Sequence, residues 1–235
     1  SAHLLPSQGV HLFWWTPHAS EHSTAKGAGK FALTFQGTNS LEKKGLWATD
    51  GTAEGTQEIP VKNASANGVT PMGFPRRFGA LGDRLFFWGI NVSGKGGLWA
   101  TDGTSKGTVE ILAKGTGPRG LDPQGFFPFE DKLFFRGMVS LHKVGLWRTD
   151  GTAAGTIPLK VAGAGKTYGL NPNSFAELGP IGSRPRALFF SGSTEQHSTL
   201  WKTDGTSQGT VPIIPVANSP NLAPRDIISA TLTFD

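Results

Sequence analysis

The stretch Gly45-Leu46-Trp47-Ala48-Thr49-Asp50-Gly51-Thr52 decides the fold, because its pattern returns three more times along the 235-residue chain. Every copy contains Leu-Trp-x-Thr-Asp-Gly-Thr, followed by two variable residues, then Gly-Thr and a short apolar segment. The copies lie at 45–52, 97–104, 145–152 and 199–206. A motif that returns about every 50 residues is typical of an architecture in which each copy is one structural unit.

Two further signals share this period. A Leu-x-Phe segment precedes each motif, at 33–35, 85–87, 133–135 and 188–190, with a fifth copy at 232–234. Further upstream lies Val/Leu-x-Pro with Phe or Ile three residues after the Pro, at 69–74, 121–126, 170–175 and 222–227. Each unit is thus predicted to hold four short strands: the Pro-x-x-Phe segment, Leu-x-Phe, Leu-Trp-x-Thr and the segment after Gly-Thr. Asp-Gly between the third and fourth strands is a strong hairpin signal.

Four-stranded units of this length are typical of β-propeller blades, since one small sheet must stack on its neighbours to bury both faces. We therefore predict an all-β fold with one domain over residues 1–235. Its repeat units are expected at about 31–81, 82–130, 131–180 and 181–230, with 1–30 and 231–235 closing the ring. Five blades are preferred, with Phe13-Trp14-Trp15-Thr16 as a degenerate third strand. Four blades are the alternative, in which residues 10–16 form a first strand.

Composition supports a folded, turn-rich protein. Glycine (33) and proline (16) are frequent, and 16 Phe and 7 Trp supply apolar area for a core. The absence of Cys excludes disulfides, thiolate nucleophiles and Cys-type zinc sites. The apolar stretches are too short to cross a membrane as a helix, which needs ~20 residues. A net charge of +5 favours contact with anionic polymers.

The four copies resemble the bacterial ELWxxDGT repeat family, whose units read Leu-Phe-Phe and then Glu-Leu-Trp-x-x-Asp-Gly-Thr-x-x-Gly-Thr. The resemblance covers roughly residues 31–235 and implies a propeller-like protein that is secreted or lies at the cell surface. The chain departs from the family at the Glu that precedes Leu-Trp. That position holds Gly45, Gly97, Gly145 and Thr199, so any role of a repeated carboxylate there is lost.

The motif itself predicts structural roles for its most regular residues. The four aspartates are expected to cap the hairpin turn, with a cation site in each repeat as the alternative: Asp50, Asp102, Asp150 and Asp204. The four tryptophans are expected to pack between blades, with sugar stacking as the alternative: Trp47, Trp99, Trp147 and Trp201.

Ligand-binding candidates come from two other positions. A basic residue recurs in every predicted turn between the second and third strands, at Lys43, Lys95, Lys143 and His197. Arg148 and Lys202 lie inside two of the predicted third strands and extend this expected basic array. The residue after Leu-x-Phe varies from copy to copy, as expected for a site tuned blade by blade or for a solvent-facing position. It is Gln36, Trp88, Arg136, Ser191 or Asp235, and Trp88 and Arg136 are the ligand candidates.

No catalytic set is predicted. Two copies match the Gly-x-Ser-x-Gly pattern of a nucleophile elbow, but the Ser is replaced by Ala53 and Ala153 in the other two. We therefore expect a non-enzymatic protein, without cofactor or metal, that recognises glycans, in particular anionic ones, in a lectin-like manner through several sites. The alternative is a protein-interaction or scaffold module of a surface assembly. Nucleic acid is a poor candidate partner, because no contiguous basic stripe with interleaved aromatic residues is present.

Overall fold

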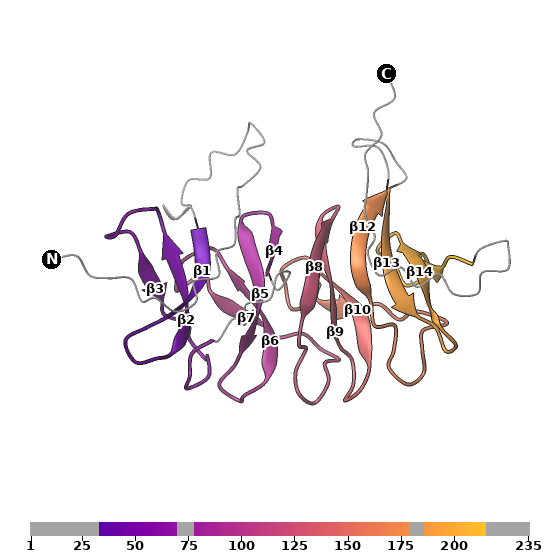
Figure 1. Ribbon diagram of the computed structural model, residues 1–235, viewed down its shortest axis with the longest axis horizontal. Coiled ribbons are helices and arrows are strands. Elements are labelled where there is room, and N and C mark those ends of the chain that lie inside the picture. The colour runs from indigo at the N-terminus through magenta and orange to yellow at the C-terminus, as the bar shows by residue number, and fades with distance from the viewer. Residues whose placement is uncertain (1–32, 70–77, 179–185, 215–235) are drawn as a thin grey trace, which may run out of the picture. The chain divides into compact units, whose positions relative to one another are not determined.

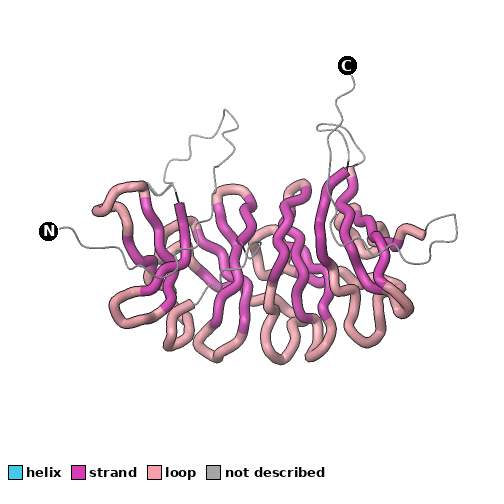
Figure 2. Tube along the Cα trace, in the orientation of Figure 1, coloured by secondary structure: helices cyan, strands magenta, loops and turns pink. Residues whose placement is uncertain are grey.

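The computed structural model describes residues 33–69, 78–178 and 186–214. Over these residues the chain contains strands, turns and loops and no helix (Figure 2). The all-β prediction is confirmed. The chain divides into two compact units, residues 1–112 and 113–235, and each is described by itself. The single domain over residues 1–235 stays a prediction.

The first unit contains two antiparallel sheets in which each strand pairs with the next along the chain (Figure 1). The three-stranded sheet has the order β1-β2-β3, and the four-stranded sheet the order β4-β5-β6-β7. The strands are β1 (Leu33–Thr38), β2 (Lys44–Thr49), β3 (Gln57–Ile59), β4 (Phe78–Leu81), β5 (Arg84–Ile90), β6 (Gly96–Thr101) and β7 (Val109–Ile111).

The second unit contains two four-stranded sheets with the same sequential, antiparallel order. One is formed by β8 (Gln124–Phe129), β9 (Lys132–Met138), β10 (Val144–Thr149) and β11 (Ile157–Pro158). The other is formed by β12 (Asn173–Leu178), β13 (Ala187–Ser193), β14 (Ser198–Thr203) and β15 (Val211–Pro212). The four-strand prediction holds for these sheets and for β4 to β7.

The sheets are offset by one strand from the sequence units at 31–81, 82–130, 131–180 and 181–230. The boundary between residues 81 and 82, for example, separates β4 from β5, which pair in one sheet. The Pro-containing segment thus belongs to the sheet of the Leu-x-Phe that follows it, because a short turn joins the two strands. Strands β8 and β12 begin directly after Pro123 and Pro172.

The register places the Phe of each Leu-x-Phe segment opposite the motif Trp. The pairs are Phe35 with Trp47, Phe87 with Trp99, Phe135 with Trp147 and Phe190 with Trp201. Within each unit, one face of a sheet packs on the Trp face of the next. Leu46 shares a buried cluster with Trp99, and Leu146 shares one with Trp201. The core of each unit therefore lies between its stacked sheets.

The structure does not describe the residues that were predicted to close the ring. The segments assigned to closure, residues 1–30 and 231–235, lie outside the described residues, as do the aromatic run 12–16 and the last Leu-x-Phe at 232–234. The first strand expected at 222–227 lies outside them as well.

Candidate functional site

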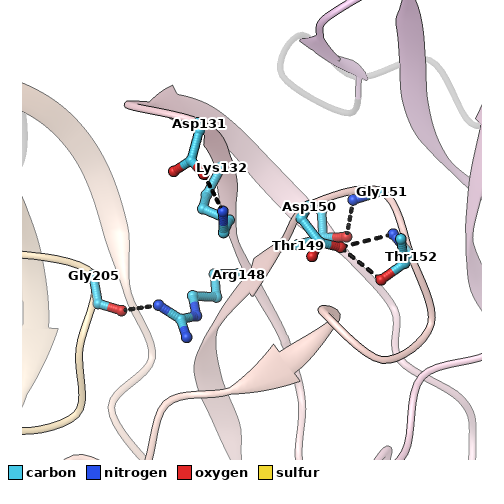
Figure 3. Close-up of polar contacts among 8 residues, drawn as sticks. All are labelled: Asp131, Lys132, Arg148, Thr149, Asp150, Gly151, Thr152 and Gly205. Atoms are coloured by element: carbon cyan, nitrogen blue, oxygen red, sulfur yellow. Dashed lines mark hydrogen bonds and ion pairs between the residues drawn. The ribbon is translucent and has the colours of Figure 1, made fainter.

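The hairpin motif is held by a network of side-chain hydrogen bonds in which the aspartate caps the turn. Asp150 Oδ1 accepts hydrogen bonds from the Thr152 backbone N–H at 2.9 Å and from Thr152 Oγ1 at 2.7 Å (Figure 3). Thr152 Oγ1 in turn accepts a bond from the Gly155 N–H at 2.9 Å. The same contacts recur around the other three aspartates, Asp50, Asp102 and Asp204. The carboxylates therefore act in the turns, as the motif predicts.

The glycine of Gly-Thr is required by the approach of this carboxylate. A Cβ atom at Gly155 would lie 2.1 Å from Asp150 Cγ, which no side chain permits. The hydrogen bonds from Thr152 lower the pKa of Asp150, the side-chain bond contributing most. The pKa of Asp204 is lowered in the same way by the backbone and side-chain bonds of Thr206. Both carboxylates are thus held in their charged form.

The motif tryptophans are packing residues in the two units. Trp99, Trp147 and Trp201 are fully buried, and the indole Nε1 of the half-buried Trp47 is buried as well. Phe135 and Trp147 stack with ring centroids 6.4 Å apart and an interplanar angle of 14°. None of the four indole Nε1 atoms has an acceptor among the described residues. A stacking face for a sugar is therefore not offered by Trp99, Trp147 or Trp201.

A glycine that sequence reasoning missed makes room for each Trp. It lies two residues after the Phe of Leu-x-Phe, at Gly37, Gly89, Gly137 and Gly192. A Cβ atom at these positions would lie between 2.6 and 2.9 Å from Trp Cδ1. The signal was present in the sequence, since Leu-x-Phe-x-Gly recurs in all four complete copies.

The position before Leu-Trp, which holds Gly in the first unit, is covered there by a carboxylate from the neighbouring strand. Glu110 of β7 extends over Gly97, where a Cβ would lie 2.4 Å from Glu110 Oε1. Asn91 Nδ2 donates to the same oxygen at 2.9 Å. Glu58 and Gly45 repeat this arrangement with Asn39. In the second unit the residues at the Glu110 position are Pro158 and Pro212, so the arrangement is absent there.

The recurrent basic residues end the turns between the second and third strands. Asn39 N–H donates to the Lys43 carbonyl at 3.0 Å, and Asn91 N–H donates to the Lys95 carbonyl at 3.0 Å. The carbonyls of Lys143 and His197 accept the matching bonds. Because the backbone closes the turn, the lysine side chains extend outward and are exposed, whereas His197 is half-buried. All four sheets thus carry a basic side chain at one equivalent place.

In each unit, the segment before the Pro is hydrogen-bonded to the end of the second strand of the sheet that follows it. The Val69 carbonyl accepts a hydrogen bond from Ile90 N–H at 2.8 Å, and the Leu170 carbonyl accepts one from Ser193 N–H at 2.7 Å. The residue before each of these is a glycine with positive φ, Gly68 at 90° and Gly169 at 76°. The pattern Gly-Val/Leu-x-Pro in the sequence carries this signal, and its Val/Leu-x-Pro part belongs to the predicted repeat.

The variable position after Leu-x-Phe has a different environment in each sheet. Trp88 is buried, with 8% of its surface exposed, and its indole lies over Gly96, where a Cβ would be 2.6 Å from Nε1. It therefore offers no face to a ligand at the surface. Arg136 is half-buried, and its Nη1 and Nη2 donate to Asn173 Oδ1 at 2.9 Å and Asn171 Oδ1 at 2.8 Å. Asp235 lies outside the described residues.

Arg148 belongs to the scaffold of the second unit. Its Nη1 donates to the Gly205 carbonyl at 2.7 Å, which ties β10 to the hairpin between β14 and β15 (Figure 3). Lys132 and Asp131 form an ion pair close to it in the same sheet. The Arg148 side chain is therefore engaged within the fold and is not part of the basic array that the sequence predicted.

The described segments contain no group of three or more His, Asp or Glu side chains arranged to hold a metal ion. No helix in that part of the chain is long and apolar enough to cross a membrane. The candidate binding groups are therefore the basic turns, repeated in both units, and the half-buried Arg136.

No protein-family model and no curated relative matches the chain. Among solved structures, the chain is similar to one assigned as TolB from Agrobacterium tumefaciens, with 11% sequence identity and a TM-score of 0.43. The match covers 76% of this chain and 59% of that one, so the chain spans less than two thirds of the length of the matched structure.

Proposed function

We propose that the chain is a non-catalytic binding protein that recognises anionic glycans through the basic turns of its repeated sheets. The observation that carries this proposal is the basic side chain at one equivalent turn position in all four sheets, Lys43, Lys95, Lys143 and His197. A turn closed by backbone hydrogen bonds fixes the point from which its basic side chain extends. An anionic polymer provides matching charges at intervals and would engage several turns at once, so that weak contacts add by avidity.

The other regular residues support a binding role over a catalytic one. The four motif carboxylates are engaged by threonines in the turns, and three of the motif tryptophans are fully buried. Neither set supplies an acid, base or nucleophile that faces a substrate. The repeated residue that remains at the surface of each sheet is the basic residue of the turn, and a basic residue suits the binding of an anionic ligand.

The proposal includes the wider architecture that the repeat implies. We propose that the sheets are blades of one closed β-propeller with five blades, completed by residues 1–30 and 231–235. The motif resemblance to ELWxxDGT repeats supports a location at the cell surface or outside the cell, where glycans with uronic acid or sulfate groups are found. Several sites in one ring would provide the valency that the basic turns require.

Binding to heparin, polygalacturonate and neutral dextran tests the proposal. We expect the wild-type protein to bind the two anionic polymers and not dextran, with affinity falling as salt is raised, because exposed charges are screened. Replacing Lys43, Lys95 and Lys143 together by Gln should weaken polymer binding about tenfold or more, since each exposed ion pair contributes up to about 1 kcal/mol.

The matched control changes three other exposed lysines outside these turns, Lys62, Lys106 and Lys114, to Gln. It alters net charge equally but leaves the turns intact. Equal loss in both triple variants would show that net charge alone drives binding. Binding of dextran as tight as that of the polyanions would refute anionic glycan recognition.

A second candidate is a protein-interaction or scaffold module of a surface assembly. It is favoured by the last strand of the four-stranded sheets, where apolar side chains remain exposed. Val109 of β7 is 41% exposed, and Leu112 directly after this strand is 69% exposed. Because β7 is the last strand of its sheet, a partner strand would find both backbone groups and apolar contacts there. Capture of a specific protein from the native surface, lost in Val109→Lys, would favour this candidate.

A further inference from the structure

A group of polar side chains surrounds Arg136 at the start of two neighbouring strands of the second unit. We call this group the Arg136 cluster; it consists of Gln124, Arg136, Asn171, Asn173 and Ser191. Gln124 pairs with Arg136 in the register of β8 and β9. Asn173 pairs with Ser191 at the equivalent place of β12 and β13. The two hydrogen bonds from Arg136 to Asn171 and Asn173 join these equivalent places.

The guanidinium in this cluster has unused donor capacity. An arginine carries five N–H donors, and the described residues give hydrogen-bond partners to two of them, both neutral amide oxygens. No carboxylate in the described ranges forms an ion pair with Arg136. Three of its five N–H donors therefore remain for an anionic group.

The carboxylate of Asp122 influences the charge of Arg136. Burial lowers the pKa of Arg136, and the field of Asp122 partly opposes this effect. The Asp122 carboxylate accepts a hydrogen bond from Gln124 Nε2 at 3.2 Å. The Asp122 carboxylate is thus hydrogen-bonded to the Gln124 amide, and it influences the Arg136 guanidinium through its charge without a hydrogen bond to it.

The backbone at the cluster is held in an uncommon conformation. Asp122 and Asn171, which occupy the same position before Pro in the two sheets, have φ values of 45° and 47°. The registers of β8 with β9 and of β12 with β13 then shift after Gln124 and Asn173. Ser174 next to Asn173 has φ 53°. Such left-handed residues cost of order 1 kcal/mol each and concentrate at sites where side chains must be aimed.

We propose that the Arg136 cluster binds one acidic sugar residue, whose carboxylate contacts Arg136 and whose hydroxyls contact the amides around it. This inference rests on the proposed recognition of anionic glycans and gives it one specific site, distinct from the repeated turns. A planar guanidinium matches a carboxylate with two parallel hydrogen bonds. Amide side chains both donate and accept, as sugar hydroxyls require. The other sheets carry Gln36, Trp88 and Ser191 at the Arg136 position, so this site would occur once.

Calorimetric binding of trigalacturonate to the full chain tests the inference, with maltotriose as the neutral probe of equal length. We expect trigalacturonate to bind and maltotriose not to bind. Arg136→Gln should weaken trigalacturonate binding at least about tenfold, because a charge-assisted pair is lost. Arg136→Lys, which keeps the charge but not the planar fork, should lose severalfold. Unchanged affinity in Arg136→Gln would overturn the inference, as would equal binding of maltotriose.

Two further variants keep the test independent of folding and of the proposed function. If Arg136→Gln does not fold, Asn173→Ala removes an exposed amide and should still weaken trigalacturonate binding severalfold; no change would refute the site. The Lys43, Lys95 and Lys143 triple variant should lose polymer affinity but keep trigalacturonate affinity. Polymer binding that depends on the lysines, without any trigalacturonate binding, would reject this site and leave the proposed function standing.

Discussion

Thr149 Oγ1 and Thr156 Oγ1 lie 2.6 Å apart, and the direction of the hydrogen bond between them is fixed. Thr156 must donate its single hydroxyl proton to the Thr152 carbonyl, 2.6 Å away, because a carbonyl only accepts. Thr149 therefore donates to Thr156, while it accepts from Gly151 N–H at 2.9 Å. The same threonine pair recurs at 2.6 to 2.7 Å in the other three hairpins. Thr149 and Thr156 are thus parts of one hydrogen-bond chain that ends at the Thr152 carbonyl.

Breaking this chain should destabilise the second unit. Thr156→Val keeps the shape of the side chain but leaves the Thr149 hydroxyl and the Thr152 carbonyl without their partner. Since Thr156 is buried, we expect a loss of about 1–3 kcal/mol in the free energy of unfolding, measured by urea denaturation. Thr167→Val at an exposed linker position is the control and should change stability by less than about 0.5 kcal/mol. Equal stability of the two variants would show that the hydrogen bonds of Thr156 contribute nothing to the free energy of unfolding.

The glycine beneath the motif Trp should not accept a side chain. In Gly37→Ala the new Cβ would lie 2.6 Å from Trp47 Cδ1, so the indole must shift from its place against Phe35. We expect a loss of about 1–3 kcal/mol in the free energy of unfolding. In a Trp47→Leu background the same substitution should cost less, because the obstructing ring is gone. An identical cost in both backgrounds would disprove the proposed clash.

The glycine directly before Leu-Trp should tolerate substitution better. In Gly97→Ala the new Cβ meets the end of the flexible Glu110 side chain, which can move aside by giving up its bond from Asn91. The expected loss is about 1 kcal/mol, the contribution of a typical hydrogen bond. A Glu110→Ala background should remove most of this cost. Chemical denaturation of the four proteins measures the coupling, and additive costs would contradict it.

The turn aspartates should make stability depend on pH in acid. The pKa of Asp150 is lowered in the folded state, so its stabilising effect is present above its unfolded pKa of about 4 and is lost as pH falls through the folded value. Thr152→Val removes the side-chain hydrogen bond and should raise the pKa of Asp150 toward the ordinary range. An NMR titration of the Asp150 carboxyl carbon measures this change, and identical midpoints in both proteins would refute the assigned cause.

The candidate binding groups were only partly predictable from the sequence. The basic turn residues were found because they recur at a fixed place in the repeat. Trp88 and Arg136 looked alike in the sequence, as two members of one variable position. The structure separates them, because Trp88 is buried over Gly96 whereas Arg136 contacts Asn171 and Asn173 more than thirty residues away. Those partners come from the neighbouring sheet, and no local pattern identifies them.

The sequence by itself determined the strands and hairpins of this protein, because their causes are local. Thr149, Asp150, Thr152 and Thr156 close their turn with bonds that span at most seven residues. The motif predicted that its tryptophans pack between sheets, but only the tertiary structure showed which residues they meet. It placed Trp99 against Leu46 and Trp201 against Leu146, and it joined Arg136 to the asparagines of the next sheet. Such contacts depend on how one sheet stacks on another, and the spacing within a repeat does not encode them.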